Sequence, residues 1–351
     1  MPGRLTVSLG ALARNYRTIC ASNRSEVAAV VKANAYGIGV PLAAKCLEEA
    51  GCTTFFVATL VEGIRLRQIS AGSDIYVLEG LLRAADRGVF TQHQLYPVIN
   101  SLTQLSRWNK EGPFALHVDT GMERLGLSLV EGDEVLAQGA TPRLILSHFA
   151  RADELNARET QLQIDAMAGF GARHPDIPIS LSNSAGALLH KVPEGLIRAG
   201  IALYGGSPTG LEEAALEAVV TLSGDVLQIR DIMPGTAVGY GGTYHATEQS
   251  RLVTVGVGYA DGLPRLLSNV GSAWWQGSVY PIVGRVSMDL IHVRVDLADQ
   301  VEQLRDAPFE LIGAHILIDA VAREAQTISY EILTGLDSAG RLERVVTEAA
   351  I

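Results

Sequence analysis

The sequence has 351 residues, enough for one large barrel or for two domains of ordinary size. Apolar residues make up 48% and charged residues 19%, which is typical of globular proteins and not of disordered chains. The 38 acidic residues outnumber the 28 basic ones, so a basic surface for nucleic acid or anionic lipid is excluded. We expect small-molecule partners, with no nucleic acid and no membrane.

The N-terminal segment lacks the charged and then apolar layout of a secretory signal, and no apolar stretch is long enough to span a bilayer. We therefore expect a cytoplasmic protein. The three cysteines, Cys20, Cys46 and Cys52, show no CxxC spacing. This pattern favours buried free thiols, without a disulfide framework and without a metal site.

Short apolar runs alternate with helical patterns from about residue 9 to 220, which predicts repeated βα units. After the first run, Leu42, Cys46 and Ala50 repeat at helical spacing beside Ala43 and Leu47, and this stripe should pack on the sheet. The eight candidate strands are Val27–Val31, Thr54–Ala58, Asp74–Leu78, Leu95–Ile99, Phe114–Val118, Arg143–Ser147, Ile177–Leu181 and Leu196–Ile201.

Eight parallel strands predict a (β/α)8 TIM barrel over residues 8–220, so the expected fold class is α/β. A doubly wound open sheet is the alternative. No GxGxxG motif follows the first apolar run, which weakens a Rossmann-type sheet without excluding other open sheets.

After about Val220 the sequence becomes rich in strand-like segments, which predicts a mainly β C-terminal domain over residues 221–351. The early run Arg4–Val7 is expected to add a strand from residues 1–7 to this domain, and Trp274 and Trp275 lie in a predicted hairpin. The candidate strands are Thr221–Ile229, Arg251–Gly258, Val279–Val283, Leu290–Val295, Phe309–Ile312 and Ile316–Ile318.

Lys32 directly follows the apolar run Val27–Val31, so it should lie at the C-terminal mouth of the barrel, where barrel enzymes keep their chemistry. Partial burial disfavours the charged form of an amine, and a neutral amine can attack an aldehyde. From position alone, a solvated lysine that closes a strand is the alternative interpretation.

Six motifs are spread over most of the chain: Val31–Gly37 (VKANAYG), Asp119–Gly126 (DTGMERLG), Ser147–Ala150 (SHFA), Asn183–Ala185 (NSA), Arg198–Gly205 (RAGIALYG) and Gly258–Gly262 (GYADG). In this order they resemble the motifs of the alanine racemase family. The resemblance implies the barrel and β-domain fold, pyridoxal 5'-phosphate held as a Schiff base on Lys32, and a head-to-tail homodimer with two shared active sites. It also implies racemisation of a small amino acid, L-alanine above all, with serine or a broader range as the alternative.

Racemisation needs one acid–base group on each face of the substrate Cα. By the resemblance these catalytic residues are Lys32 and Tyr240, with Tyr240 and Met288 reaching the partner's site. Tyrosine has an ordinary pKa of about 10, so Tyr240 needs help to act as a base, and His148 is the expected helper.

Arg198 would face the cofactor's pyridine nitrogen. Because arginine keeps its proton, that nitrogen stays unprotonated and the ring is a weaker electron sink, which suits simple proton exchange. Arg124 would contact the cofactor's phenolic oxygen and the substrate carboxylate, which Met288 would also bind. The other cofactor-binding positions implied are Tyr36, His148, Asn183, Ser184, Gly200, Ile201 and Tyr330.

Asn183 and Ser184 also predict an ordinary N-cap for a helix through Leu189. The resemblance implies a narrow entrance that favours small side chains. Its lining residues would be Asp153, Tyr259, Arg265, Arg285, Ile328 and Tyr330.

One position departs from the family pattern. Many members have a lysine whose carbamate holds the arginine equivalent to Arg124, and this sequence has His117 there. Imidazole cannot be carbamylated and brings no negative charge, so Arg124 must be held differently. This departure leaves the substrate preference open.

Two further functions share the cofactor. A decarboxylase with the same domain plan is disfavoured by Arg198 and the tyrosine base. A non-catalytic carrier of pyridoxal phosphate, built on a barrel alone, is disfavoured by the additional β domain.

Overall fold

The computed structural model describes residues 1–109, 111–209, 216–297, 303–305 and 307–348. The chain divides into two compact units. The barrel unit consists of residues 13–35 and 39–203, and the β unit combines residues 1–12, 36–38 and 204–351.

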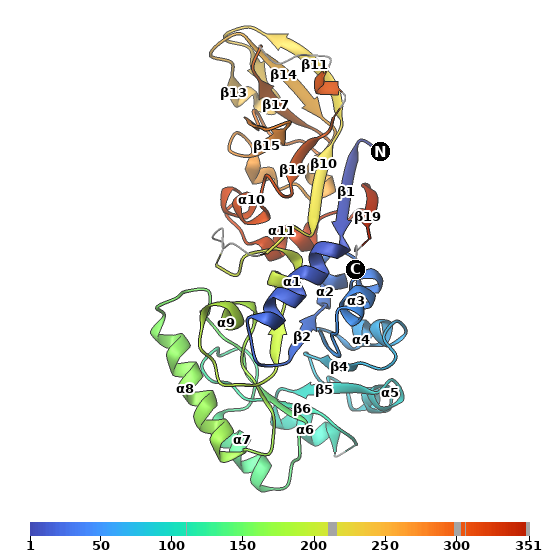
Figure 1. Cartoon of the computed structure of the whole chain (residues 1–351), viewed down its shortest axis with the longest axis vertical. Coiled ribbons are helices and arrows are strands. Elements are labelled where there is room, and N and C mark those ends of the chain that lie inside the picture. The colour runs from blue at the N-terminus through green and yellow to red at the C-terminus, as the bar shows by residue number, and fades with distance from the viewer. Residues whose placement is uncertain (110, 210–215, 298–302, 306, 349–351) are drawn as a thin grey trace. The chain divides into compact units, whose positions relative to one another are not determined.

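The barrel unit is built on eight parallel strands, as the eight apolar runs predicted (Figure 1). Strands consecutive along the chain are neighbours, and the first of them also pairs with the last. Backbone hydrogen bonds from Leu196 N to Ile179 O and from Arg198 N to Ser182 O, both 2.9 Å, complete the ring. The strands are β2 (Val27–Val30), β3 (Thr54–Val57), β4 (Asp74–Val77), β5 (Leu95–Ile99), β6 (Ala115–His117), β7 (Leu144–Leu146), β8 (Ile179–Ser180) and β9 (Ile197–Ala199).

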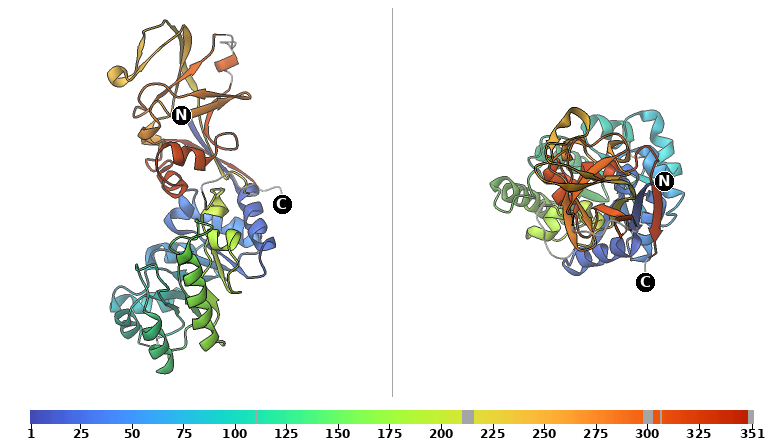
Figure 2. Two further views of the ribbon diagram at one scale, coloured as in Figure 1. Left: turned by 90° about the vertical axis from the view of Figure 1, so that its left-hand side faces the viewer. Right: turned by 90° about the horizontal axis from the view of Figure 1, so that it is seen from above.

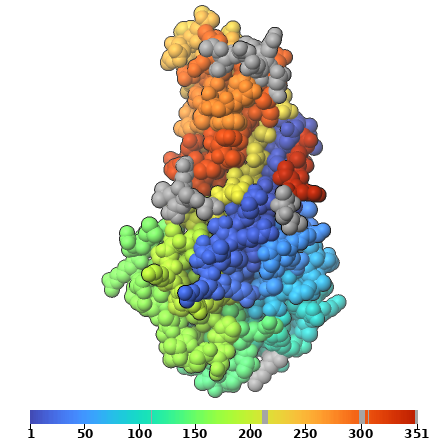
Figure 3. Space-filling view, viewed as in Figure 1, coloured from blue at the N-terminus to red at the C-terminus, as the bar shows by residue number. Residues whose placement is uncertain are grey.

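The barrel strands are apolar throughout because helices cover their outer faces while side chains fill the interior. All four residues of β2 and all four of β3 are buried. In the space-filling view, the blue N-terminal part of the unit lies against the yellow-green end of the barrel, as ring closure requires (Figure 3). The helices are α1 (Leu9–Ala21), α2 (Lys32–Tyr36), α3 (Val40–Glu49), α4 (Leu60–Arg67), α5 (Arg87–Gln92), α6 (Leu102–Trp108), α7 (Leu129–Ala137), α8 (Arg158–Arg173) and α9 (Ser184–Leu189), with short η1 (Ala84–Asp86) and η2 (Ile201–Tyr204).

The buried face of α3 differs in part from the predicted stripe. Ala43, Cys46 and Leu47 are buried as expected, and Ala44 joins them. Leu42 was predicted in the stripe but is exposed. The reason is the angular position of each residue around the helix axis. Residues 43, 44, 46 and 47 share one face of the helix, and residue 42 lies at the margin of that face.

The β unit contains a six-stranded sheet, a three-stranded sheet and a two-stranded pair. In the largest sheet, β1 (Gly3–Ser8) runs antiparallel to β10 (Val220–Gly224) and parallel to β19 (Glu343–Thr347), so the first strand lies between two much later ones (Figure 1). The remaining elements are β11 (Val226–Ile232), β12 (Ala237–Val238), β13 (Tyr244–His245), β14 (Ser250–Val255), β15 (Ser272–Trp275), β16 (Ser278–Pro281), β17 (Ile291–Val295), β18 (Phe309–Ile312), α10 (Ile318–Glu324), α11 (Ser329–Gly335), η3 (Tyr240–Gly242), η4 (Tyr259–Asp261), η5 (Arg265–Leu267) and η6 (Gln303–Arg305).

Two strand predictions in this unit were wrong. The run Thr221–Ile229 is two strands in different sheets, separated at Asp225, whose N–H donates to Pro2 O at 2.8 Å. The run Ile316–Ile318 leads into α10, which begins at Ile318, and it is apolar because Ile316 and Ile318 are both buried at this helix start. The hairpin that holds the two tryptophans is confirmed as β15 and β16.

Of the helices that the structure describes, none has both the length and the hydropathy that crossing a bilayer requires.

Replacement of Phe170 by alanine should strongly destabilise the barrel unit. Phe170 is fully buried on α8, the green helix on the outside of the barrel unit (Figure 2). The cavity left behind should lower the free energy of unfolding by about 3–5 kcal/mol, measurable by urea denaturation. Leu162→Ala on the exposed face of the same helix is the matched control and should change it by less than about 0.5 kcal/mol. Equal losses in the two variants would contradict this account.

Candidate active site

Polar and charged side chains gather at the C-terminal ends of the barrel strands. Lys32 follows β2, His117 ends β6 and His148 follows β7, while Ser184 follows β8 and Arg198 lies in β9. This is the face of a (β/α)8 barrel where substrates bind.

Arg198 is a buried cation held by oxygen and nitrogen acceptors rather than by a carboxylate. Its side chain is only 4% exposed. Nη1 donates to the carbonyl and hydroxyl of Ser180, and Nη2 donates to Ser147 O and to Nδ1 of His148. These four bonds use both hydrogens on each Nη, and Nε–H has no acceptor among the residues that the structure describes. One donor of a fixed, charged group is therefore left for a ligand.

The bond from Arg198 fixes the proton of His148. Since Nδ1 accepts a hydrogen bond 3.1 Å from Arg198 Nη2, the proton of a neutral imidazole must be on Nε2. Burial, together with the nearby cations Arg198, Arg124 and Lys32, holds the pKa of His148 well below its usual range. His148 is thus a neutral donor through Nε2.

Lys32 lies among the same charges. Burial lowers the pKa of its amine, as do Arg124 and Arg198, whereas the Glu62 carboxylate raises it. A lowered pKa increases the fraction of neutral amine, which is the form that reacts with an aldehyde or accepts a proton.

The chain takes a left-handed turn immediately after Lys32. Ala33, Asn34, Ala35 and Tyr36 all have φ between 51° and 56°, and none of them is glycine. A left-handed conformation costs about 1–2 kcal/mol for each such residue, so the surroundings must stabilise the turn. Ala35 N donates to Val31 O and Val40 N donates to the Asn34 side chain, both at 2.9 Å.

His117 is also neutral, and its tautomer is fixed by Asn100. Nδ2 of Asn100 donates to Leu78 O and to Val98 O, both at 2.9 Å, so its Oδ1 is the acceptor. Nδ1 of His117, 2.7 Å from that oxygen, is therefore the donor, and Nε2 carries a lone pair. Burial and the neighbouring Arg198 and Arg124 lower the pKa of His117 to about 4.

The loop that carries Arg124 is organised by Asp119. The Asp119 carboxylate accepts backbone N–H groups from Gly121, Met122 and Glu123 at 2.8–2.9 Å. Gly126 closes the loop with a φ of +113°, and a Cβ there would lie 2.9 Å from the backbone nitrogen of Asp119. Glycine is therefore required at this position, and Arg124 is left exposed at the tip of the loop.

The segment after β8 forms the predicted capped helix. The Asn183 side chain accepts from Gly186 N at 2.9 Å, and α9 runs from Ser184 to Leu189. The Ser184 hydroxyl oxygen accepts from Gly200 N at 2.9 Å and from Ala202 N at 3.3 Å, so its own hydrogen stays available to a ligand. Ile201 begins η2 directly after Gly200.

In the β unit, the Gly258–Gly262 motif lies against the segment that contains Met288. Tyr259 N and Ala260 N donate to Ser287 O and Met288 O, both at 3.0 Å. Gly258 is required there, because a Cβ would lie 2.3 Å from Met288 O.

The Tyr240 loop lies beside this pair of segments. The guanidinium of Arg285 lies against Gly241, whose Cβ position is 2.9 Å from Nη1. Tyr240 is 72% exposed and Met288 is 51% exposed. These large side chains are therefore presented to solvent.

Two aromatic residues predicted to bind phosphate also belong to the β unit. The rings of Tyr36 and Tyr204 stack with centroids 4.4 Å apart, and Tyr330 lies 6.0 Å from Tyr36 at a tilt of 43°. Burial raises the pKa of Tyr36, with a contribution from Tyr330, so its hydroxyl keeps its proton and can act as a donor.

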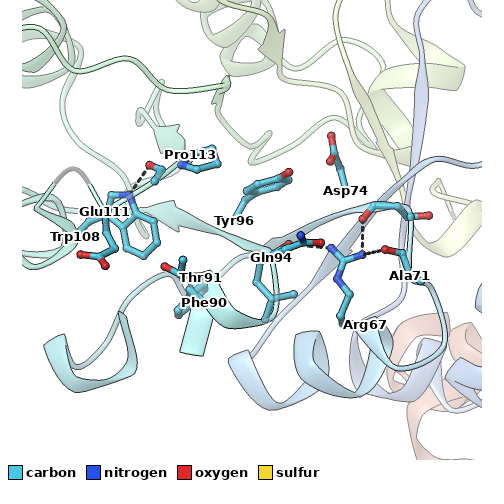
Figure 4. A pocket seen from close by; sticks show the side chains of 14 residues that line it. Arg67, Ala71, Asp74, Phe90, Thr91, Gln94, Tyr96, Trp108, Glu111 and Pro113 are labelled. Atoms are coloured by element: carbon cyan, nitrogen blue, oxygen red, sulfur yellow. Dashed lines mark hydrogen bonds between the residues drawn. The ribbon is translucent and has the colours of Figure 1, made fainter. Parts of the chain in front are cut away.

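A surface cavity of about 380 Å³ lies elsewhere on the barrel unit, where β4, β5 and β6 begin (Figure 4). The described residues around it include none of the predicted site residues. Its charged groups already have partners: Arg67 donates to five backbone carbonyls, Asp74 pairs with Arg143, and Glu111 pairs with Arg87. The cavity is therefore not the candidate active site.

Two family models match the chain. Residues 7–208 match the alanine racemase N-terminal domain, and residues 219–346 match the alanine racemase C-terminal domain. The chain belongs to the alanine racemase family. The resemblance drawn from the six motifs is thereby confirmed.

Relatives from this family match over nearly the whole length. An alanine racemase of Acidiphilium cryptum is 42% identical over 97% of this chain and 98% of its own, and a catabolic alanine racemase of Agrobacterium fabrum is 40% identical over 95% and 90%. The alanine racemase of Bartonella henselae, solved with covalently bound pyridoxal phosphate, has a TM-score of 0.90 at 36% identity and covers 99% of this chain and 100% of its own. The biosynthetic alanine racemase of Pseudomonas aeruginosa has a TM-score of 0.88 at 32% identity, covering 99% of each chain.

The predicted entrance residues of this alanine racemase family member lie in both units. Asp153 belongs to the barrel unit, and Arg265, Arg285 and Ile328 belong to the β unit, all with exposed side chains. Whether they line one entrance stays a prediction.

Several residues that organise the site were not found from the sequence. Asn100, Ser147 and Ser180 fix the histidines and Arg198 through contacts between strands, which no local motif signals. The motif Thr59-x-x-Glu62 is a capping-box signature and could have revealed Glu62 as a cap of α4.

Arg341, to which the motifs assigned no role, also organises the site. It binds Asp289 at 2.6 Å and approaches Asp261 at 3.6 Å, which ties the C-terminal segment to the Met288 turn.

His117 should make the stability of the protein fall between pH 6.5 and 4. In this window the unfolded chain protonates the imidazole, whose ordinary pKa is about 6.5. The folded protein, in which that pKa is lowered to about 4, does not. The loss of unfolding free energy from pH 7.5 to 4.5 should be about 2–3 kcal/mol smaller in His117→Gln than in the unchanged protein, measured by urea denaturation at fixed concentration. His245→Gln, which removes an exposed histidine of the β unit, is the control. An unchanged loss in His117→Gln would refute the assignment.

Proposed function

We propose that this protein interconverts L- and D-alanine with pyridoxal 5'-phosphate bound to Lys32. The observation that carries the proposal is the state of Arg198, a buried guanidinium with four hydrogens committed to the protein and only Nε–H left. A single charged donor fits an unprotonated pyridine nitrogen, which accepts one hydrogen bond. The family membership and the relatives named alanine racemase support the same reaction.

The residues at the barrel mouth fit the cofactor. The amine of Lys32 suits its aldehyde, and the Ser184 hydroxyl with the backbone of Gly200 and Ile201 would hold the phosphate, joined by Tyr36 and Tyr330. Asn183 fixes α9 behind Ser184, and His148 lies beside Arg198. When bound, pyridoxal phosphate supplies an electron sink for the pair left on Cα after proton removal.

The proton transfers belong to two side chains of the protein. On one face of Cα, the neutral amine of Lys32 takes a proton, and the ammonium form so made returns one. Tyr240 Oη does the same on the other face, and the Nε2 proton of His148 would stabilise its phenolate by a charge-assisted hydrogen bond. Arg124 would bind the substrate carboxylate with two parallel bonds, with the backbone at Met288 and the ring of Tyr259 completing the pocket.

Arg198 also bears on the choice among pyridoxal phosphate reactions. A guanidinium at the ring nitrogen weakens the electron sink, which favours return of the proton over loss of CO2 or amino transfer. Racemisation of serine or of a broader range of amino acids is the alternative, to be decided by the substrate assay.

The assay uses the cofactor-loaded protein with L-alanine, L-serine, L-lysine and L-glutamate in turn, followed by chiral chromatography and CO2 detection. We expect D-alanine to appear fastest and no CO2 to form. Persistent absence of any D-product would overturn the proposed function, and CO2 release from lysine or glutamate would favour the decarboxylase.

Lys32→Ala should abolish both the absorbance of covalently bound cofactor and racemisation in both directions, because it removes the anchor and one proton carrier. Tyr240→Phe should keep the absorbance and slow turnover by about 100- to 10,000-fold, the usual effect of losing one acid–base group. Absorbance spectra and chiral chromatography on the same samples check both expectations. A fully active Tyr240→Phe protein would show that Tyr240 is not a proton carrier.

We also propose a head-to-tail homodimer in which Tyr240 and Met288 enter the partner's site. Their exposure in the single chain supports this, since catalytic side chains are expected to be enclosed. Cys20, Cys46 and Cys52 form no disulfide among the residues that the structure describes, which is typical of a reducing compartment and supports a cytoplasmic location.

A mixture of two inactive variants tests the dimer. If the sites are shared, Lys32→Ala and Tyr240→Phe chains refolded together at equal amounts should regain about a quarter of the normal activity, because each mixed dimer contains one intact site. Each variant refolded alone is the control. No recovery, with mixed dimers verified by native mass spectrometry, would place Lys32 and Tyr240 of one site on the same chain.

A further inference from the structure

Glu62 lies where β3 ends and α4 begins, and its carboxylate joins two separate segments of the barrel unit. Oε2 accepts Ala58 N at 2.8 Å and Thr59 N at 3.0 Å, which closes the capping box of α4. Oε1 accepts Ala33 N at 2.7 Å. A residue that only capped its own helix would not need the second oxygen.

Ala33 is the first residue of the left-handed turn that follows Lys32. Its N–H has no helical acceptor, because the residue four positions earlier belongs to the extended strand β2. The carboxylate supplies the missing acceptor and connects the end of β3 to the residue next to Lys32. The direction of the lysine side chain depends on this backbone conformation.

The charge of Glu62 acts on Lys32 as well. The charged or titratable groups that face the Lys32 amine are Arg124 from the loop after β6, His148 from the segment after β7, Arg198 from β9, and Glu62. Among these described groups Glu62 is the one carboxylate, and it opposes the effect of the two arginines.

We propose that Glu62 is a positioning residue for Lys32, whose carboxylate holds the left-handed turn through Ala33 N–H and balances the arginines around the lysine amine. This role rests on one part of the proposed function, namely that Lys32 is the reactive amine. Glu62 itself touches neither substrate nor cofactor in this account.

The test follows Lys32 in the protein without cofactor. Trace labelling with acetic anhydride across a pH series, with peptide mass spectrometry, gives the pH at which Lys32 becomes reactive, and Lys45 and Lys191 serve as internal references. In Glu62→Gln this midpoint should fall by about one pH unit, because removal of a nearby negative charge disfavours the ammonium form. Hydrogen exchange in the peptide spanning residues 31–37 should become at least several-fold faster, because Ala33 N–H loses its acceptor.

Two matched controls separate positioning from helix capping. Thr59→Ala removes the other half of the same capping box, and Glu79→Gln removes a carboxylate that accepts Leu60 N at 3.1 Å at the same helix start. Both should leave the Lys32 midpoint and the exchange of residues 31–37 unchanged. If Glu62→Gln merely matches Thr59→Ala in both measurements, the proposal fails.

A second variant covers the possibility that Glu62→Gln does not fold. Glu62→Asp keeps the charge and shortens the reach, so exchange at residues 31–37 should still become faster while the midpoint moves by less than half a unit. Exchange equal to that of the unchanged protein would refute the bond to Ala33. A protein that shows the predicted Lys32 shift but does not racemise alanine when loaded would overturn the proposed function and leave the role of Glu62 standing.

Discussion

The site depends on a guanidinium buried in the barrel without a carboxylate partner. Removing a cation from water is costly unless hydrogen bonds replace its hydration. Ser180, Ser147 and His148 provide those bonds to Arg198, and they come from two segments, β8 and the residues that follow β7. Burial is the main cause of the lowered pKa values of Lys32, His117 and His148, and Arg198 lowers each of them further. Burial and this cation together keep two histidines neutral and make a lysine easier to deprotonate.

The C-terminal end of the barrel therefore carries more basic than acidic side chains. Lys32, Arg124 and Arg198 attract a phosphate and a carboxylate, the two anionic groups of the proposed cofactor and substrate. His117 does not change this excess of positive charge, because its buried imidazole is neutral near pH 7. Asn100 fixes the tautomer of His117, because its side-chain oxygen accepts the proton on Nδ1.

Much of the fold could be predicted from the sequence, because buried parallel strands are continuous apolar runs. All eight barrel strands were found within a few residues of their ends. The mistakes arose where context overrides local pattern: the run Thr221–Ile229 changes sheets at Asp225, and Ile316–Ile318 begins a helix. Lys32, Arg198 and the capped start of α9 were identified from motifs. Glu62, Asn100 and the left-handed turn were not, since a bond such as Ala33 N to Glu62 joins residues 29 positions apart.

The place of β1 in its sheet has a consequence for synthesis on the ribosome. Its partners β10 and β19 begin at Val220 and Glu343, so β1 cannot pair with either of them until these later segments have been synthesised. At typical elongation rates of about 5–20 residues per second, β1 stays without its first partner for roughly 10–40 seconds while the barrel is made. An unpaired strand is a hazard for association with other nascent chains. The alternation of polar Arg4, Thr6 and Ser8 with buried Leu5 and Val7 leaves it only half apolar during that interval.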